Sequence, residues 1–329
     1  MGIKATTAKS IESLFQTQKS FSDKFFLSES MSDVEKESKT QELISALHYE
    51  ASSLLCATNF KSHVSEKQSV DLSHIKYEGV DIFRYLLAIL NIWGISSEEF
   101  LSAFDEKDCY LEMRHRLHQK KWNDEPVVIV DIDDVILPFR EYFTHWLVTE
   151  KGISADAEST EYYHTQGILD AGFLPEELFE EFIEIGKLKT APACEETIEQ
   201  LNKLYDAGFW IQLLTARPSH NLTCFYDTTY WLNESDLKFH RIDHTPEKFL
   251  WVSKSKYYQK SKIICAIDDS PKHSFEYSKH GIQVLSPEKP FNSELKQKPR
   301  IKMYSDVKKI YDYVIALNQE KELKNAPRL

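Results

Sequence analysis

The chain has 329 residues, of which 42% are hydrophobic and 28% charged, and its formal net charge is -12 at pH 7. This composition is typical of a soluble globular protein with room for two domains, and the acidic excess argues against non-specific binding to a nucleic-acid backbone. No run of about 18 apolar residues could span a membrane, and the first residues lack a signal-peptide core. The five cysteines form no C-x-x-C pair, which predicts reduced thiols and a cytoplasmic protein.

The first part of the chain, from about residue 11 to residue 117, has the apolar spacing of helices. Apolar residues recur every three or four positions in IESLFQTQKSFSDKFF, TQELISALHYEASSLLCATNF, YEGVDIFRYLLAILNIWG and SEEFLSAFDEKDCYLEMRHRL. Ser96 or Ser97, with Glu98 and Glu99 close behind, predicts the start of the last helix. No β-rich run interrupts this region, so we predict an all-α helical bundle.

The second part of the chain alternates between strands and helices. After the basic, polar segment HQKKWNDEP, the short β-branched runs VVIV, FWIQLLT, KIICAI and IQVLS are separated by helical stretches. This alternation predicts βαβ units and a parallel sheet. The sequence thus predicts a tail at 1–9, a helical domain at 10–118, a linker at 119–126, an α/β domain at 127–320 and a second tail at 321–329.

Polar residues follow three of the predicted strands. They are Asp131, Asp133 and Asp134 after the first run, Thr215 and Arg217 after the second, and Asp268 and Asp269 after the third. Crowded carboxylates repel one another and resist burial, and a divalent cation relieves that repulsion. Because α/β sheets bind ligands at the carboxyl ends of parallel strands, we expect these groups to form a metal-dependent site rather than a solvated loop.

Metal-assisted phosphoryl transfer through an aspartyl intermediate requires this set of groups. A carboxylate nucleophile approaches an anionic phosphate only when a cation neutralises both. A hydroxyl and an ammonium group then hold the phosphoryl oxygens, for which Thr215 and either Lys254 or Lys256 are available. A second carboxylate protonates the leaving oxygen and then activates water.

This arrangement resembles the haloacid dehalogenase (HAD) superfamily of phosphatases over nearly all of residues 127 to 292, which implies a Rossmann-like α/β domain and Mg²⁺. The resemblance implies Asp131 as nucleophile and metal ligand, Asp133 as general acid/base and carbonyl ligand, Thr215 and one of Lys254 and Lys256 as phosphoryl ligands, and Asp268 with Asp269 as further metal ligands.

Finer detail looks like the 5'-nucleotidase and deoxyribonucleotidase branch of that superfamily. The segments that carry this resemblance are DIDDV, LLTARP, IDDSP and a late PFN from Pro290 to Asn292. It implies a helical cap at about 140–205, whose aromatic residues either stack on a base or fill a core. These aromatic residues are Tyr142, Phe143, Trp146, Tyr162, Tyr163 and Phe173. Arg217 either contacts substrate or pairs with a carboxylate.

The helical part carries carboxylates of its own. Glu50 lies on one predicted helix, and Glu78 and Asp81 share a face of another. The pattern resembles the all-α nucleotide pyrophosphohydrolases, the dimeric dUTPase and MazG group. That resemblance implies a homodimer in which Glu50, Glu78 and Asp81 hold Mg²⁺ and Lys61, Lys107 and Arg114 contact substrate.

The sequence differs from that family at two positions where the family has catalytic or ligand-binding residues. Ser53 stands where the family has a second glutamate, and Leu111 where it has a polar residue. The helical domain is therefore either an active pyrophosphohydrolase or a degenerate domain for dimerisation or nucleotide sensing. Glu78 and Asp81 could also be a solvated helix face.

Together these motifs predict a cytoplasmic, Mg²⁺-dependent nucleotide phosphatase, acting on a nucleoside monophosphate and first of all a deoxynucleotide. The expected partner is this nucleotide or another small phosphorylated substrate, with neither membrane nor nucleic acid involved. The alternatives are a phosphatase for a non-nucleotide ester and a nucleotide-sensing regulatory protein.

Overall fold

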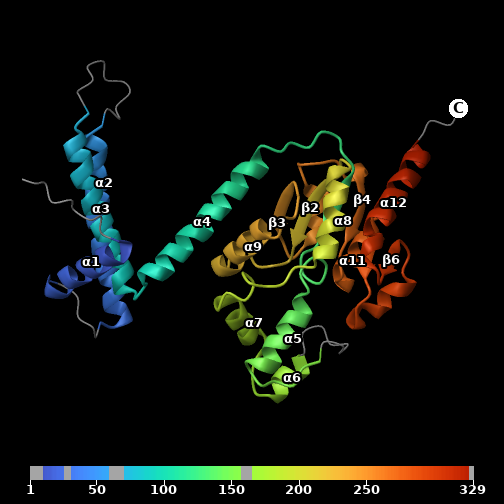
Figure 1. Cartoon of the computed structure of the whole chain (residues 1–329), viewed down its shortest axis with the longest axis horizontal. Helices are drawn as coiled ribbons and strands as arrows, with labels where there is room; N and C mark the ends of the chain where they lie inside the picture. Colours follow the sequence, from blue (N-terminus) through green and yellow to red (C-terminus); the bar gives the residue numbers. More distant parts are fainter. Residues whose placement is uncertain (1–9, 26–30, 59–69, 157–164, 326–329) are drawn as a thin grey trace, which may run out of the picture. The chain divides into compact units, whose positions relative to one another are not determined.

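The computed structural model describes residues 10–25, 31–58, 70–156 and 165–325 (Figure 1). The chain divides into two compact units, Met1–Asp105 and Glu106–Leu329. The division falls inside helix α4 (Ser97–His118), whereas the sequence places the boundary at a linker of residues 119–126. The second half of α4 therefore belongs with the α/β unit.

The first unit is built from helices α1 (Ile11–Phe25), α2 (Asp33–Cys56), α3 (Leu72–Ile92) and the beginning of α4. A capping box starts α2, in which Ser32 and Glu35 each satisfy the other's backbone N–H. Ser96 and Glu99 form the same pair before α4. A small apolar cluster joins α2 to α3 through Leu43, Ala88 and Ile92.

The second unit contains a six-stranded parallel sheet with strand order β3-β2-β1-β4-β5-β6. The strands are β1 (Val127–Val130), β2 (Trp210–Thr215), β3 (Arg241–His244), β4 (Ile263–Ile267), β5 (Gln283–Pro287) and β6 (Ile301–Tyr304). The four strands predicted from apolar runs are confirmed as β1, β2, β4 and β5. The sequence did not predict β3 and β6, which are the two edge strands.

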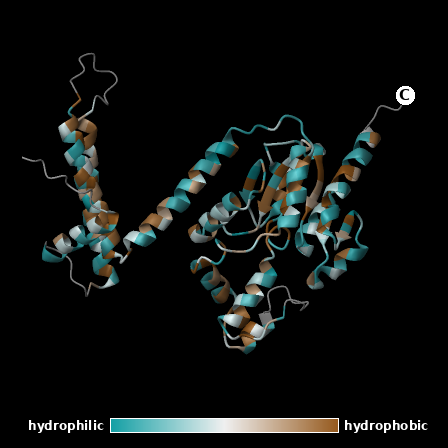
Figure 2. Cartoon of the chain, viewed as in Figure 1, coloured by the Kyte–Doolittle hydropathy of each residue, from teal (hydrophilic) through white to brown (hydrophobic). Residues whose placement is uncertain are grey.

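Helices and apolar clusters cover both faces of this sheet. Val128 and Val130 contribute to one cluster and Val127 and Ile129 to the other, as the alternation of side chains along a strand requires. Because both faces are buried, the central strands are apolar apart from Gln212 and Thr215 of β2, and Figure 2 shows them mostly in brown. The helices are α8 (Glu195–Asp206), α9 (Leu222–Glu234), α10 (Lys248–Lys254), α11 (Pro271–Lys279) and α12 (Ile310–Asn325), with short 3-10 helices at Lys260–Lys262, Pro290–Gln297 and Val307–Lys309.

Three further helices form a separate group after the carboxyl end of β1 (Figure 1). They are α5 (Phe139–Thr149), α6 (Thr165–Asp170) and α7 (Pro175–Glu184). Helix α8, which the sequence assigned to the cap at 140–205, packs on β2 and α12 instead. The helical group beyond the sheet is thus shorter than predicted.

The aromatic residues of this group mostly form its own core. Phe143 and Trp146 are buried, and their rings lie 5.2 and 5.3 Å from the Phe182 ring. Tyr142 is half-buried and Phe173 is exposed. Tyr162 and Tyr163 lie outside the described residues. A core role is therefore the one that fits Phe143 and Trp146.

Within the described ranges, no single helix has the length and apolar character to cross a membrane, and only α3 and α4 taken together as a bent pair pass on length and composition. The five cysteines are free thiols, of which Cys224 and Cys265 are buried.

Candidate active site

Two aspartates at the site continue the hydrogen-bonding pattern of the central strands. The Asp131 N–H donates to the Ile267 carbonyl at 2.9 Å, and the Asp268 N–H donates to the Leu285 carbonyl at 3.1 Å. Asp131 Oδ1 accepts from the Ile132 N–H at 2.8 Å, and Asp268 Oδ1 accepts from the Ser270 N–H at 3.0 Å. The sheet therefore fixes both carboxylates at the carboxyl ends of neighbouring strands.

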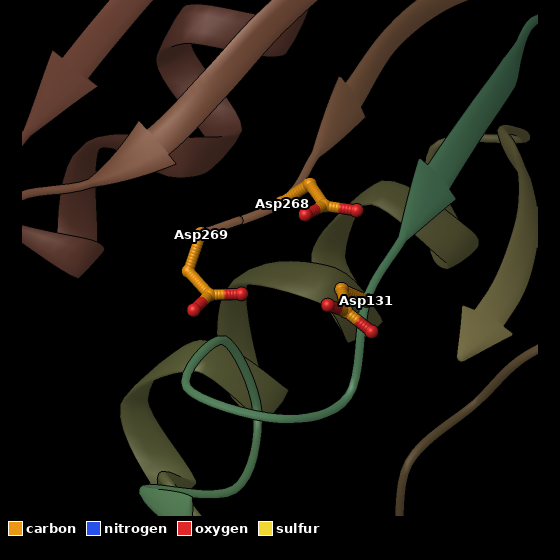
Figure 3. A group of neighbouring side chains, drawn as sticks. All are labelled: Asp131, Asp268 and Asp269. Atoms are coloured by element: carbon orange, nitrogen blue, oxygen red, sulfur yellow. The ribbon is translucent and has the colours of Figure 1, made fainter. Parts of the chain in front are cut away.

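Asp131, Asp268 and Asp269 converge in space (Figure 3), each offering a carboxylate oxygen within 4.8 Å of the others. All three are buried. Both Asp269 side-chain oxygens are buried without a hydrogen-bond partner. Burial, together with the charges of Asp131, Asp134 and Asp268, raises the pKa of Asp269 well above its usual value.

A bound divalent cation fits this donor set. Buried carboxylates without partners are costly, and hard cations such as Mg²⁺ prefer carboxylate oxygens. Within the described ranges, this is the one group in which three such ligand atoms come so close.

The lysine of the site is Lys248, at the start of α10. Its Nζ lies 2.7 Å from Asp131 Oδ2 and 2.8 Å from Asp268 Oδ2, and its side chain is buried. The structure places neither Lys254 nor Lys256 in the cluster, because both side chains are exposed at and beyond the far end of α10. The sequence assignment of this lysine is corrected accordingly.

Burial raises the pKa of Asp131 to about 6, although the adjacent Lys248 charge opposes this rise. The neighbouring charges of Asp268 and Asp133 raise it further. For Lys248, burial lowers the pKa, but the two carboxylates outweigh burial and raise it overall. One ammonium group therefore compensates only part of the negative charge gathered here.

Asp133 pairs with Arg217. The Arg217 Nη2 donates to Asp133 Oδ1 at 2.6 Å, and its Nε donates to Oδ2 at 3.0 Å. Arg217 Nη1 donates to Thr228 Oγ1 on α9 at 2.9 Å. Of the two roles that the sequence left open for Arg217, the structure shows pairing with a carboxylate.

Thr215 and Asn292 complete the surroundings. Thr215 ends β2, is fully buried, and accepts the Arg217 N–H through its Oγ1 at 3.2 Å. Asn292 Nδ2 donates to the Asp269 carbonyl at 3.0 Å and to the Pro287 carbonyl at 2.9 Å. The PFN segment noted in the sequence therefore supports the backbone of Asp269.

In the first unit, α2 and α3 bring Glu50 next to Glu78. Ser53 Oγ donates to Glu78 Oε1 at 2.9 Å, and His74 Nε2 lies 2.7 Å from the same oxygen. The pKa of Glu50 is raised, first by its hydrogen bond with Glu78 and also by the charges of Glu78 and Asp81. The sequence did not identify His74 as part of this group.

The substrate-binding residues predicted for the helical domain are Lys61, Lys107 and Arg114, and the two that the structure describes belong to the other unit. Lys61 lies outside the described residues. Lys107 and Arg114 belong to the second unit, where Lys107 Nζ donates to the Tyr226 hydroxyl at 2.6 Å. Leu111 is exposed.

Comparisons with known proteins give only a limited likeness. No family model matches the chain, and no curated protein matches it. Among solved structures, a putative beta-phosphoglucomutase from Thermotoga maritima is 14% identical, with a TM-score of 0.40 over 58% of this chain and 99% of that one. A haloacid dehalogenase-like hydrolase from Streptococcus pneumoniae is 14% identical, with a TM-score of 0.41 over 58% of this chain and 98% of that one. A D,D-heptose 1.7-bisphosphate phosphatase from B. bronchiseptica is 12% identical, with a TM-score of 0.33 over 59% and 98%. TM-scores and sequence identities this low do not support the assignment of an activity to this chain.

Proposed function

We propose that the chain is a Mg²⁺-dependent phosphomonoesterase of the HAD type, with its active site at Asp131, Asp268 and Asp269. The observation that carries the proposal is the group of three buried carboxylates at the ends of β1 and β4, of which Asp269 has both oxygens unpartnered. Such a group is stable when a cation binds it, and it lies where parallel sheets bind ligands.

Asp131 is the proposed nucleophile. Its carboxylate oxygen attacks phosphorus, and the bond from phosphorus to the ester oxygen breaks, which leaves an aspartyl phosphate. Lys248 and Thr215 would bind phosphoryl oxygens as charge redistributes. Asp131, Asp268, Asp269 and the Asp133 carbonyl would hold Mg²⁺, which when bound neutralises the repulsion between carboxylate and phosphate.

Asp133 is the proposed general acid and base. It gives a proton to the leaving alkoxide and later takes one from the water that attacks the aspartyl phosphate. That second step breaks the bond between phosphorus and the Asp131 oxygen and regenerates the carboxylate. Arg217, which pairs with Asp133, would set the position of this carboxyl group.

For the substrate we propose a nucleoside 5'-monophosphate, and first of all a deoxynucleotide. The support is the resemblance of DIDDV, LLTARP, IDDSP and PFN to the nucleotidase branch, and the role of Asn292 in holding the Asp269 backbone adds a structural reason for the last of these motifs. A non-nucleotide phosphomonoester, such as a sugar phosphate, is the alternative.

For the helical unit we propose a nucleotide-binding or dimer-forming role in a cytoplasmic homodimer, without pyrophosphohydrolase activity. Ser53 and His74 both hydrogen-bond to Glu78 Oε1, so only Glu78 Oε2 remains for a metal, and Ser53 supplies no carboxylate of its own. This contact favours a degenerate site over an active one.

The experiment is a substrate panel with Mg²⁺. Ribo- and deoxynucleoside mono-, di- and triphosphates and a set of sugar phosphates are assayed for phosphate and pyrophosphate release, with the native protein and with Asp131→Asn. Phosphate from monophosphates that disappears in the variant is expected. Hydrolysis of sugar phosphates alone would overturn the nucleotide assignment, and pyrophosphate release that Glu78→Gln abolishes would show an active helical unit.

A further inference from the structure

A cavity of about 750 Å³ lies along the edge strand β3 of the α/β unit. Its wall also includes the second half of α4, the segment 120–122, Trp210 of β2, helix α9 and the residues just after α10. It includes none of Asp131, Asp268, Asp269 and Lys248. Its volume is that of a small-molecule site, and the proposed phosphatase chemistry does not use it.

The charge of this cavity is opposite to that of the chain. In a protein of net charge -12, its wall carries five lysine and arginine side chains and one carboxylate. The cations are Arg114, Lys120, Lys121, Arg241 and Lys256. The carboxylate is Asp243, whose Oδ2 lies 2.6 Å from Arg241 Nε. Four positive charges therefore remain to attract an anion.

Flat aromatic surfaces accompany these charges. Tyr110, Trp122, Trp210, Phe225 and Tyr257 all line the cavity. The Arg241 guanidinium lies 3.3 Å from the centre of the exposed Tyr257 ring. Trp210 is buried, so the half-buried Tyr110, Trp122 and Phe225 and the exposed Tyr257 are the rings that offer stacking partners for a planar group. Guanidinium and ammonium groups bind phosphate.

His240 and His244 are uncharged members of the wall, and the His240 ring is packed between Tyr205 and Trp210. Burial lowers the pKa of each to about 4, so both are neutral at pH 7. His240 stacks on the Trp210 ring with a centroid distance of 4.5 Å. The cavity thus combines a cationic rim with an aromatic wall, which suits a ligand that has both phosphates and a planar ring.

We propose that this β3-edge cavity binds a nucleoside polyphosphate at a site separate from the carboxylate cluster. A triphosphate carries up to four negative charges, which match the excess of cations, and a base offers the planar ring. The wall holds no group of carboxylates that could bind a catalytic metal, so the ligand is bound there and not hydrolysed.

The cavity is also connected to the proposed general acid. His244, which lines it, lies with Nδ1 3.3 Å from the Arg217 carbonyl oxygen. Arg217 in turn pairs with Asp133. A ligand that displaces His244 would shift Arg217 and hence Asp133, so the site would regulate hydrolysis.

Binding is tested by calorimetry with ATP in EDTA, using Asp131→Asn so that turnover does not interfere. In this background, Lys121→Ala/Lys256→Ala is compared with the matched control Lys254→Ala/Lys279→Ala, since all four side chains are exposed. We expect ATP to bind about tenfold or more weakly to the first double variant and unchanged to the second. Adenosine and inorganic triphosphate should each bind more weakly than ATP.

Equal ATP affinity in the two double variants, or no ATP binding at all, would overturn the proposal. ATP binding that Lys248→Met removes while Lys121→Ala/Lys256→Ala retains it would place the nucleotide in the carboxylate cluster instead. Because this arm uses an inactive variant without metal, its outcome does not depend on whether the protein is a phosphatase.

The link to Arg217 is tested with glycerol 2-phosphate and Mg²⁺, followed by glycerol release, because an alkoxide leaving group needs the proton of Asp133. Saturating ATP with a matching excess of Mg²⁺ should change kcat/KM of the native protein at least twofold, and ATP should have no such effect on Lys121→Ala/Lys256→Ala. A native kcat/KM that ATP does not alter would overturn the regulatory link.

Discussion

Arg217 holds Asp133 by two parallel hydrogen bonds, at 2.6 Å from Nη2 and 3.0 Å from Nε. The guanidinium is buried, whereas the Asp133 side chain remains 28% exposed. The guanidinium therefore fixes the orientation of the Asp133 carboxylate on one side. The other side remains accessible to a substrate or to water. This relationship makes Arg217 a positioning residue for the proposed general acid.

Arg217→Lys should therefore slow the step in which Asp133 protonates the leaving group. An ammonium group cannot donate in the two-pronged manner of a guanidinium, so Asp133 loses its orientation. We expect kcat/KM, which reports the step that forms the aspartyl phosphate, to fall about 10- to 100-fold for alkyl phosphates, whose leaving groups need a proton. For p-nitrophenyl phosphate, whose leaving group does not, kcat/KM should change little. An equal loss for both ester classes would contradict a role through Asp133.

Lys248→Met should reduce both stability and activity. It removes the ammonium group that lies between Asp131 and Asp268, and leaving buried charges unpaired costs about 3–5 kcal/mol. Thermal denaturation with and without Mg²⁺ measures the loss, which bound metal should reduce in part. Lys254→Met is the matched control from the same helix and should behave as the native protein does. A similar loss in both variants would show that Lys248 has no special role.

Asp269→Asn should stabilise the metal-free protein. The substitution removes one charge from a group whose burial and neighbours raise the Asp269 pKa. A gain of about 1 kcal/mol corresponds to a rise in Tm of roughly 2–4 °C. The same variant should lose the further stabilisation that Mg²⁺ gives the native protein. Asp108→Asn, on the exposed surface of α4, is the control and should alter neither quantity.

The metal-free protein should also become less stable as pH rises toward 6. Burial raises the pKa of Asp131 from 3.8 to about 6 in the folded state, so the unfolded chain releases this proton first. Folding stability attributable to Asp131 therefore falls between pH about 4 and about 6, by roughly 1–3 kcal/mol. The Tm difference between Asp131→Asn and the native protein in EDTA should grow over that interval. A difference that is constant with pH would contradict a raised pKa.

The central strands could be predicted from sequence because they are buried on both faces. VVIV and IICAI are continuous apolar runs, and WIQLLT is one apart from Gln212 and Thr215, as expected for short strands buried on both faces. Strand β3, with the sequence RIDH, lies at the edge of the sheet and carries Arg241 and Asp243, so its pattern resembles that of a loop.

The unrecognised β3 explains the misplaced lysine. Because RIDH does not look like a strand, the segment leading to Lys248 shows no relation to the sheet in the sequence, which points instead to Lys254 and Lys256. The carboxylate cluster could be predicted without β3, because Asp131 follows the apolar run VVIV and the Asp268–Asp269 pair follows IICAI. Helix α8 could not be placed from sequence for a similar reason. Its amphipathic pattern predicts one buried face, but it does not show that this face packs on β2 and α12 and not in the cap.

The most direct test of the central claim is to trap the phosphorylated enzyme. The native protein, Asp131→Asn and Asp108→Asn are mixed with p-nitrophenyl [³²P]phosphate and Mg²⁺, quenched in acid and analysed for covalently bound label. We predict label that hydroxylamine removes in the native protein and in Asp108→Asn, located at Asp131 by mass spectrometry, and none in Asp131→Asn. Hydrolysis by the native protein without any trapped label, or label that persists in Asp131→Asn, would contradict Asp131 as the nucleophile.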